Sequence, residues 1–300
     1  MGFEPPPRLA NALGEVRDEG ASAWLDRLGA ELDEAAARRG VSVERVHLPG
    51  GRSSLVAHVR RPDGSPAVLK LAPARFRPEA ERAALAHWDG LGAVRLLDPG
   101  VEDGALLLER LHPEVSVRTL PEAKALLEAA GTLRRLWVDP PEGRNCETVP
   151  ERTGRQAASM RATAKALPDV APLVDAAVRA RAELVAAPPE LKLLHGTFRQ
   201  SKVLQGERMP WLAVGPDPVV GECAFDLARL VRDRVEDLIG SPSGPSITRR
   251  RVKRLAESLD VDRDRLRGWT LFRAVESGAR ALRVGRVRDG ENLLEFAGWL

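Results

Sequence analysis

The hydrophobic pattern of this chain changes near residue 111, and that change limits the folds open to it. Before this point, short apolar runs alternate with turn residues, whereas beyond it apolar residues recur at helical spacing almost throughout. A strand-rich segment followed by a helix-rich one predicts an α+β fold with two lobes. We therefore expect a small β-rich lobe over residues 1–111 and a larger helical lobe over residues 112–300, joined by a short hinge.

The first lobe is predicted to hold an antiparallel sheet with one helix laid across it. Strands are expected at residues 55–60, 67–71, 94–97 and 105–108. The first two of these flank a turn at residues 62–65 and should form a hairpin. One-sided apolar patterns predict helices over residues 24–35 and 78–88, and Gly40 and Gly90 are placed to end them.

The second lobe is predicted to be mainly helical, with proline and glycine clusters separating its helices. Helices are expected over residues 121–137, 151–167, 171–187, 225–238, 246–259 and 266–284. A strand is expected at residues 211–214. No internal repeat and no low-complexity linker interrupts this pattern.

The charges of the chain nearly cancel, because it has 46 basic and 43 acidic residues and a net charge of +3. The dense basic run, Arg249–Arg254, falls in a predicted amphipathic helix, and we expect it to be a solvated face of that helix. Since no aromatic residues are interleaved with it, nucleic acid is not an expected partner.

Cellular location is indicated only by negative features of the sequence. No run of eighteen apolar residues is present and the N-terminal residues do not resemble a leader, so we expect a cytoplasmic protein without membrane association. Cys146 and Cys223 lie in no paired motif. They support neither a disulfide framework nor a zinc site, and we expect both to be packing residues.

The segment Leu193–Leu204 has the sequence LLHGTFRQSKVL, and the run Trp211–Val214 follows it and leads into Gly215-Pro216-Asp217. In this order the chain also carries Pro66–Leu71, Gly92–Leu97, Ala105–Leu111, Ala224–Leu230 and Leu266–Thr270. With these segments, which extend over about residues 20 to 290, the chain resembles the aminoglycoside phosphotransferase family and most closely its streptomycin 6-phosphotransferase and hydroxyurea phosphotransferase branch. The resemblance implies a protein-kinase-like fold.

The resemblance assigns nucleotide-binding roles to residues of the first lobe. Lys70 matches the lysine that grips the α and β phosphates, and Glu81 matches the glutamate that holds this lysine, with Glu79 as an alternative register. An ion pair that only supports the lobe is the competing interpretation. The loop that carries Gly50, Gly51, Ser53 and Ser54 corresponds to the phosphate-covering loop, and the hinge residues Glu109 and Leu111 correspond to those that meet an adenine edge.

The chain departs from the family pattern at the positions that carry the reaction. Thr197 stands where the pattern has the aspartate that accepts the substrate proton, and a hydroxyl lacks the basicity for this step. Lys202 and Gly215 stand where the pattern has the asparagine and aspartate that hold Mg²⁺. The formal charge of these positions changes from −2 to +1, so we expect them to repel a divalent cation.

Neighbouring residues leave alternative roles open. Asp217 is a candidate for a displaced metal ligand, although a shift of two positions in a proline-flanked turn argues against it. His195 is a candidate base, but a role in supporting the loop is favoured. Asp226 is expected to cap or brace the same loop.

The sequence therefore predicts a pseudokinase that lacks an intact catalytic site and a metal site. Lys70, Arg199 and Lys202 are expected to attract a small anion, with ATP or ADP bound without Mg²⁺ as the candidate cofactor. A regulatory or scaffolding role with a partner protein follows. The alternative is an enzyme with repurposed chemistry in a bacterial natural-product pathway, and residual small-molecule phosphotransfer is the least favoured.

Overall fold

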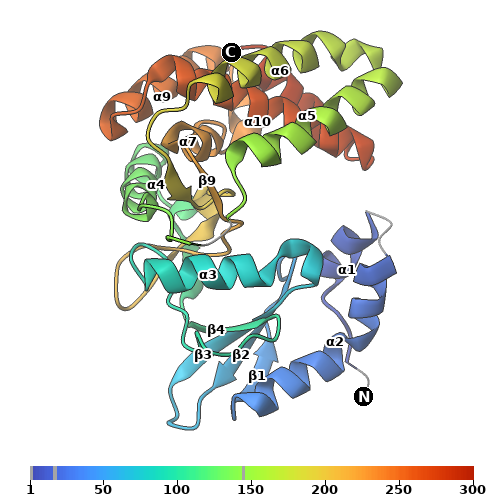
Figure 1. Cartoon of the computed structure of the whole chain (residues 1–300), viewed down its shortest axis with the longest axis vertical. Coiled ribbons are helices and arrows are strands. Elements are labelled where there is room, and N and C mark those ends of the chain that lie inside the picture. The colour runs from blue at the N-terminus through green and yellow to red at the C-terminus, as the bar shows by residue number, and fades with distance from the viewer. Residues whose placement is uncertain (1–2, 16–18, 144–145) are drawn as a thin grey trace. The chain divides into compact units, whose positions relative to one another are not determined.

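The computed structural model describes residues 3–15, 19–143 and 146–300. Its contacts divide the chain into two compact units (Figure 1). The first comprises Met1–Glu114 together with Leu204–Asp217, and the second comprises Val115–Val203 together with Pro218–Leu300. No helix within the described residues combines the length and apolar character needed to cross a membrane.

The first unit is built on a four-stranded antiparallel sheet in the order β1–β2–β3–β4. Its strands are β1 (Ser42–Val46), β2 (Leu55–Arg60), β3 (Pro66–Leu71) and β4 (Ala105–Glu109). The predicted hairpin is confirmed, with Leu55 opposite Leu71 and Arg60 opposite Pro66. The turn that joins its strands is fixed by Asp63, whose carboxylate accepts hydrogen bonds from the backbone and hydroxyl of Ser65 at 2.9 and 2.6 Å.

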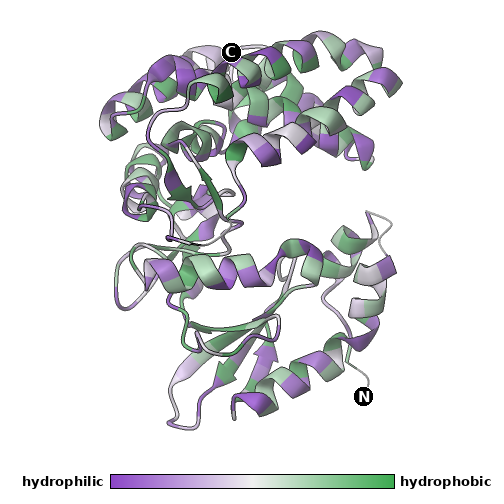
Figure 2. Cartoon of the chain, viewed as in Figure 1, coloured by the Kyte–Doolittle hydropathy of each residue, from purple (hydrophilic) through white to green (hydrophobic). Residues whose placement is uncertain are grey.

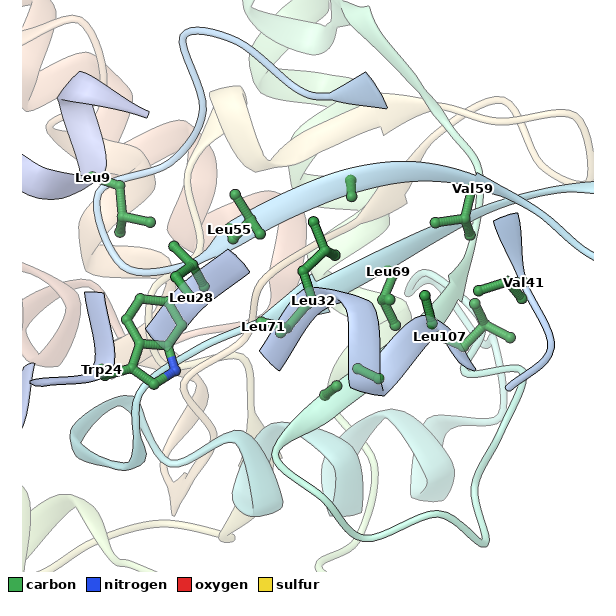
Figure 3. Packing of buried hydrophobic residues seen from close by; sticks show 14 of the residues in the cluster. Leu9, Trp24, Leu28, Leu32, Val41, Leu55, Val59, Leu69, Leu71 and Leu107 are labelled. Atoms are coloured by element: carbon green, nitrogen blue, oxygen red, sulfur yellow. The ribbon is translucent and has the colours of Figure 1, made fainter. Parts of the chain in front are cut away.

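One face of this sheet is covered by the N-terminal helices α1 (Pro7–Gly14) and α2 (Glu19–Arg38). Leu28 and Leu32 of α2 pack with Leu55 and Leu69 of the sheet, as Figure 3 shows. Alternate residues of β2 and β3 point into this core because side chains of a strand alternate between its two faces. Burial of such side chains stabilises a core by roughly 1.5–3 kcal/mol each. The cluster therefore fixes α2 on the sheet.

The helix α3 (Pro78–Trp88) lies between β3 and β4 in the chain, and its Glu81 is buried. A short 3-10 turn, Ala74–Phe76, precedes it, and Arg77 adopts a left-handed conformation with φ of 52° between the two. The predicted strand at residues 94–97 is wrong. Ala93, just before this segment, and Leu96, within it, form only isolated bridges, to Ala213 and Leu108, so the segment is not a strand of the sheet.

Short strands occupy the middle of the sequence. They are β5 (His112–Ser116), β6 (Lys192–Leu194), β7 (Val203–Gln205), β8 (Leu212–Ala213) and β9 (Val219–Gly221). The strands β5, β7 and β8 form one small sheet, and β6 pairs with β9 in another. The segment Leu204–Asp217 belongs to the first unit, where Ala213 bridges to Ala93.

The second unit is mainly helical. Its helices are α4 (Glu122–Leu136), α5 (Val149–Ala166), α6 (Ala171–Ala186), α7 (Cys223–Val231), α8 (Val235–Ile239), α9 (Gly244–Leu259), α10 (Arg263–Arg283) and α11 (Val287–Ala297). Helix α10 carries an extensively buried face, with Trp269 and Phe272 nearly inaccessible to solvent. Figure 2 shows hydrophilic and hydrophobic residues alternating along α9, as an amphipathic helix requires.

Two predictions about these helices need correction. The helix predicted over residues 225–238 is divided, because Arg234 takes a left-handed φ of 58° between α7 and α8. The basic run on α9 is not wholly a solvated face. Arg251 is only 4% exposed and donates to the carbonyl oxygens of Val231 and Asp233 at 2.8 and 2.7 Å. Its guanidinium closes the end of α7 and does not face solvent.

Candidate functional site

The lysine assigned to phosphate contact is held in the first unit by a buried ion pair. Lys70 on β3 places its Nζ 2.6 and 2.5 Å from the two carboxylate oxygens of Glu81 on α3. The side chains are 13% and 5% exposed, whereas Glu79 is exposed on the same helix. A carboxylate that accepts two contacts fixes the position of the ammonium. The structure therefore pairs Lys70 with Glu81 and not with Glu79.

The glycine-containing loop between β1 and β2 takes a conformation that depends on Gly50. This residue has a φ of +74°, and a Cβ there would lie 3.2 Å from the carbonyl oxygen of His47. Arg52 of the same loop forms an ion pair of 2.5 Å with Glu15, just beyond α1. Ser54 is buried. The Arg52–Glu15 ion pair thus holds the loop to the chain just after α1. The sequence pattern did not predict this contact.

The hinge residues use their side chains within the first unit. The Glu109 carboxylate accepts from the backbone N–H of Arg95 at 2.7 Å and pairs with Arg208 at 2.8 Å. Arg110 donates to the carbonyl oxygens of Val59 and Ala67. Leu111 is buried. These contacts hold the end of β4 against the sheet.

The loop Leu193–Leu204 is braced from α7 in the second unit. The Asp226 carboxylate is fully buried and accepts from the backbone N–H groups of His195 and Gly196 at 2.7 and 2.9 Å. Burial raises the pKa of Asp226, while the charge of Arg273 and the two hydrogen bonds act in the opposite direction. The Asp226 carboxylate thus holds the loop backbone at His195 and Gly196.

His195 serves the conformation of the loop. Its side chain is fully buried and stacks edge to face on Phe198 at 5.5 Å between ring centroids. The Nδ1 atom accepts from the backbone N–H of Thr197 at 3.3 Å. This contact ties the imidazole to the backbone of the loop it belongs to.

The substituted loop positions contact each other directly. Lys202 donates from its Nζ to the Oγ1 of Thr197 at 2.7 Å. The Lys202 ammonium therefore lies directly beside the Thr197 hydroxyl. Gly215, in the first unit, has a φ of +63° and contributes no side chain.

Asp217 is engaged by a cation within its own unit. Its carboxylate forms an ion pair with Arg77, the N-cap residue directly before α3. The contact was not predicted, because the two residues are 140 positions apart in the sequence. The left-handed conformation of Arg77 directs the chain into α3. No motif in the sequence predicts this conformation.

Comparison with known proteins decides the family. The sequence profile described as "Aminoglycoside/hydroxyurea antibiotic resistance kinase" matches residues 39–285. The chain belongs to this family. It is 33% identical over 297 residues to the streptomycin 6-kinase of Streptomyces glaucescens, covering 98% of this chain and 94% of that protein. It is 34% identical to the hydroxyurea phosphotransferase of Kitasatospora aureofaciens, covering 97% and 94%.

Solved structures confirm the fold of this aminoglycoside/hydroxyurea kinase family member. The aminoglycoside phosphotransferase APH(4)-Ia has a TM-score of 0.62 and 16% identity, with 90% of this chain and 97% of that chain covered. A thermostable mutant of that protein, in ternary complex with AMP-PNP and hygromycin B, has a TM-score of 0.61 and 15% identity, with 89% and 96% covered. The choline kinase LicA of Streptococcus pneumoniae has a TM-score of 0.61, 11% identity and coverage of 91% and 99%.

The Mg²⁺ that kinases of this fold use does not fit the residues that this family member presents. Magnesium requires hard oxygen ligands, but Lys202 brings an ammonium and Gly215 brings no side chain. The remaining acidic candidate, Asp217, already pairs with a guanidinium. Across residues 3–15, 19–143 and 146–300, no group of acidic, histidine or cysteine side chains is arranged to hold a metal ion.

Proposed function

We propose that this member of the aminoglycoside/hydroxyurea kinase family is a pseudokinase, which does not transfer a phosphoryl group from Mg-ATP and instead binds a nucleotide or another small anion without metal. The observation that carries the proposal is the contact between Lys202 and Thr197, 2.7 Å from Nζ to Oγ1. It puts an ammonium and a hydroxyl at the positions where the family pattern has a metal-binding amide and a catalytic carboxylate.

Loss of phosphotransfer follows because the loop lacks two contributions to the reaction rate, a carboxylate that accepts the substrate proton and a bound metal ion. Without a carboxylate at position 197, the loop cannot accept the proton of a substrate hydroxyl, a contribution of about 10²–10⁴ in rate. Without the metal, the charge that develops on the transferred group loses its main electrostatic partner. The chemistry of Thr197, Lys202 and Gly215 offers no replacement for either.

Retention of nucleotide binding is supported by the first unit. The Lys70–Glu81 pair is almost fully buried, and burying two charges is costly unless their geometry is good. The ammonium it positions is the group that grips phosphates in the family pattern. A pair kept in this geometry, beside the positive φ of Gly50 in the neighbouring loop, fits continued contact with a phosphate.

A regulatory or scaffolding role explains these features more simply than a new reaction does. Repurposed chemistry would need a base or nucleophile, and His195 and Asp217 are the candidates that the sequence offers. His195 is fully buried and its Nδ1 accepts from the backbone of Thr197. Asp217 pairs with Arg77. The contacts of His195 and Asp217 therefore give both side chains a structural role.

The proposal is tested by measuring transfer of label from radiolabelled ATP to streptomycin and to hydroxyurea in the presence of Mg²⁺. The streptomycin 6-kinase of Streptomyces glaucescens, assayed alongside, serves as the active control. We expect no labelled product from the wild-type chain. Labelled product that disappears in Lys70→Ala would overturn the proposal, because contaminating kinases would not respond to that substitution.

A further inference from the structure

The first unit contains a cavity apart from the positions that the family pattern assigns to the nucleotide. Its volume is about 410 Å³, and α2, the connection from β3 to α3 and the turn before β4 all contribute to its wall. Cavities that bind small molecules usually have volumes of about 300–1,000 Å³. Lys70, Glu81 and Glu109 are not among the residues that line it. The cavity is therefore large enough for a small molecule and does not overlap the proposed nucleotide contacts.

Much of the cavity wall is apolar. Ala35 comes from α2, Leu71 ends β3, and Pro73 and Pro78 come from the connection to α3 and from its first turn. All four residues are buried. This part of the wall suits the carbon atoms of an organic ligand.

Trp24 of α2 adds one polar atom to this wall. The residue lines the cavity and is 7% exposed, and within the described residues its indole N–H makes no hydrogen bond. In Figure 3 the six-membered ring of Trp24 lies toward Leu28, and the indole nitrogen lies on the side away from it. A buried indole N–H usually has an acceptor. A ligand atom that accepts a hydrogen bond would supply the missing partner.

Three exposed carboxylates line the same cavity from separate parts of the sequence. They belong to Glu34 on α2, Glu79 on α3 and Glu102 in the turn before β4. In the part of the chain that the structure describes, none of the three takes part in a hydrogen bond or an ion pair through its side chain. Glu79, the alternative partner that the sequence left open for Lys70, thus faces this cavity.

The other charged residues of the wall already have partners. The Asp103 carboxylate pairs with Arg38 at 2.6 Å and with Arg39 at 2.7 Å, and Arg82 lies 4.0 Å away. Glu31 pairs at 3.3 Å with an arginine one turn earlier on α2. A cationic ligand would therefore find its available counter-charges in the three unpaired glutamates and not in Asp103.

We propose that this cavity binds a small hydroxylated amine, a molecule with at least two ammonium groups and one hydroxyl group. The ammonium groups donate to Glu34, Glu79 and Glu102, since charge-assisted hydrogen bonds favour this pairing. The hydroxyl oxygen accepts from the indole N–H of Trp24, and the carbon atoms pack against Leu71. An organic cation fits better than a metal ion, because an N–H donor and an apolar wall offer a metal ion no ligands.

This inference goes beyond the proposed function, because the ligand is a cation and its site lies apart from the nucleotide contacts. The test is a titration with 1,3-diamino-2-propanol in the absence of nucleotide. Failure of ATP binding would thus count against the proposed function and leave this site standing. Binding is followed by the resonance of the Trp24 indole N–H in nuclear magnetic resonance spectra. Trp24→Phe removes this resonance and so assigns it among those of the six tryptophans.

A matched ligand isolates the contribution of the hydroxyl. We expect a saturable shift of the Trp24 resonance, and binding about threefold or more tighter than that of 1,3-diaminopropane, which lacks the hydroxyl. A Trp24 resonance that does not move would overturn the proposal. Equal or tighter binding of 1,3-diaminopropane would overturn the contact between the hydroxyl and Trp24.

Matched variants distinguish this site from general attraction between an amine and surface carboxylates. Glu34→Gln/Glu79→Gln should weaken binding about fivefold, because two ion pairs with the ligand are lost. Asp26→Asn/Asp33→Asn removes the same charge from exposed positions of α2 that do not line the cavity, and it should leave the affinity unchanged. Equal loss of affinity in the two double variants would overturn the proposal.

The stability of the unliganded protein distinguishes ligand contacts from structural ones. Because Glu34 and Glu79 have no partner within the described residues, Glu34→Gln/Glu79→Gln should melt within about 2 °C of the wild type. A larger fall in melting temperature together with unchanged amine affinity would assign these carboxylates to the fold and overturn the proposal.

Discussion

Lys202 donates a hydrogen bond from its ammonium to the hydroxyl of Thr197, across 2.7 Å and five positions of one loop. The loop is otherwise intact, because Asp226 still braces its backbone and His195 still supports its turn. The loop therefore carries an ammonium and a hydroxyl on a backbone that is braced from α7.

Replacing Lys202 by alanine should weaken binding of ATP in EDTA by about tenfold, because a charge-assisted contact to phosphate is lost. Calorimetry measures this directly. Lys165→Ala, at the exposed end of α5, is the matched control and should leave the affinity unchanged. An unaltered affinity in Lys202→Ala would remove this residue from the anion-binding account.

Replacing Glu81 by glutamine should destabilise the protein by about 3 kcal/mol, because it leaves the buried Lys70 ammonium without its counter-charge. Chemical denaturation provides the free energy of unfolding. Glu79→Gln changes an exposed glutamate on the same helix, so its effect should be within about 0.5 kcal/mol. Similar effects of the two variants would contradict the buried pairing.

Asp103 should contribute to the acid sensitivity of the first unit. Its burial alone would raise its pKa, but hydrogen bonds from Arg39 and from the backbone of Ala105, with the charges of Arg39 and Arg38, bring the pKa below its ordinary value of 3.8. A depressed pKa contributes stability that is present above the ordinary value and is lost as pH falls through the folded-state value. The wild type should therefore lose stability in this acid range.

Asp103→Asn should be less stable than the wild type at neutral pH and should show a shallower loss of stability on acidification. Unfolding measured across the acid range reports both changes. Asp26→Asn, on the exposed side of α2, is the control. A wild-type slope retained in Asp103→Asn would show that other carboxylates govern the acid response.

Cys223 should resist alkylation in the folded protein. Burial, chiefly, and the nearby Asp226 charge raise the pKa of its thiol to about 12, and the thiolate is the reactive form. Mass spectrometry after iodoacetamide treatment at about pH 8 should find Cys223 unmodified in the native chain and modified after unfolding. Rapid native modification would contradict its placement as a packing residue.

The sequence predicted the parts of the fold that depend on local pattern. The β2–β3 hairpin follows from its alternation and turn residues, and α3 follows from its one-sided apolar face and the glycine after it. The break at Arg234 was not predicted, because the apolar pattern runs on across it and only a left-handed backbone divides the helix. Helix α11 was also missed, although Phe296 is fully buried there.

The sequence predicted the parts of the candidate site that lie in recognisable motifs. The loop from His195 to Lys202 and the Lys70–Glu81 pair were located by resemblance to a family pattern. The Arg77–Asp217 pair was not, because it depends on two residues brought together by folding from distant parts of the chain. A change of charge at one position, such as Lys202, can be read from the sequence. A contact between distant residues is seen only in the folded structure.

The dissociation constant of ATP, measured by calorimetry in Mg²⁺ and again in EDTA, tests the central claim most directly. A loop that carries Lys202 in place of a metal ligand should bind the bare nucleotide as tightly as the magnesium complex or more tightly, since the metal reduces the charge that the ammonium attracts. Lys70→Ala should abolish binding in both buffers. Binding that requires Mg²⁺ would contradict the account, because it would mean that a carboxylate such as Asp217 has restored the metal site.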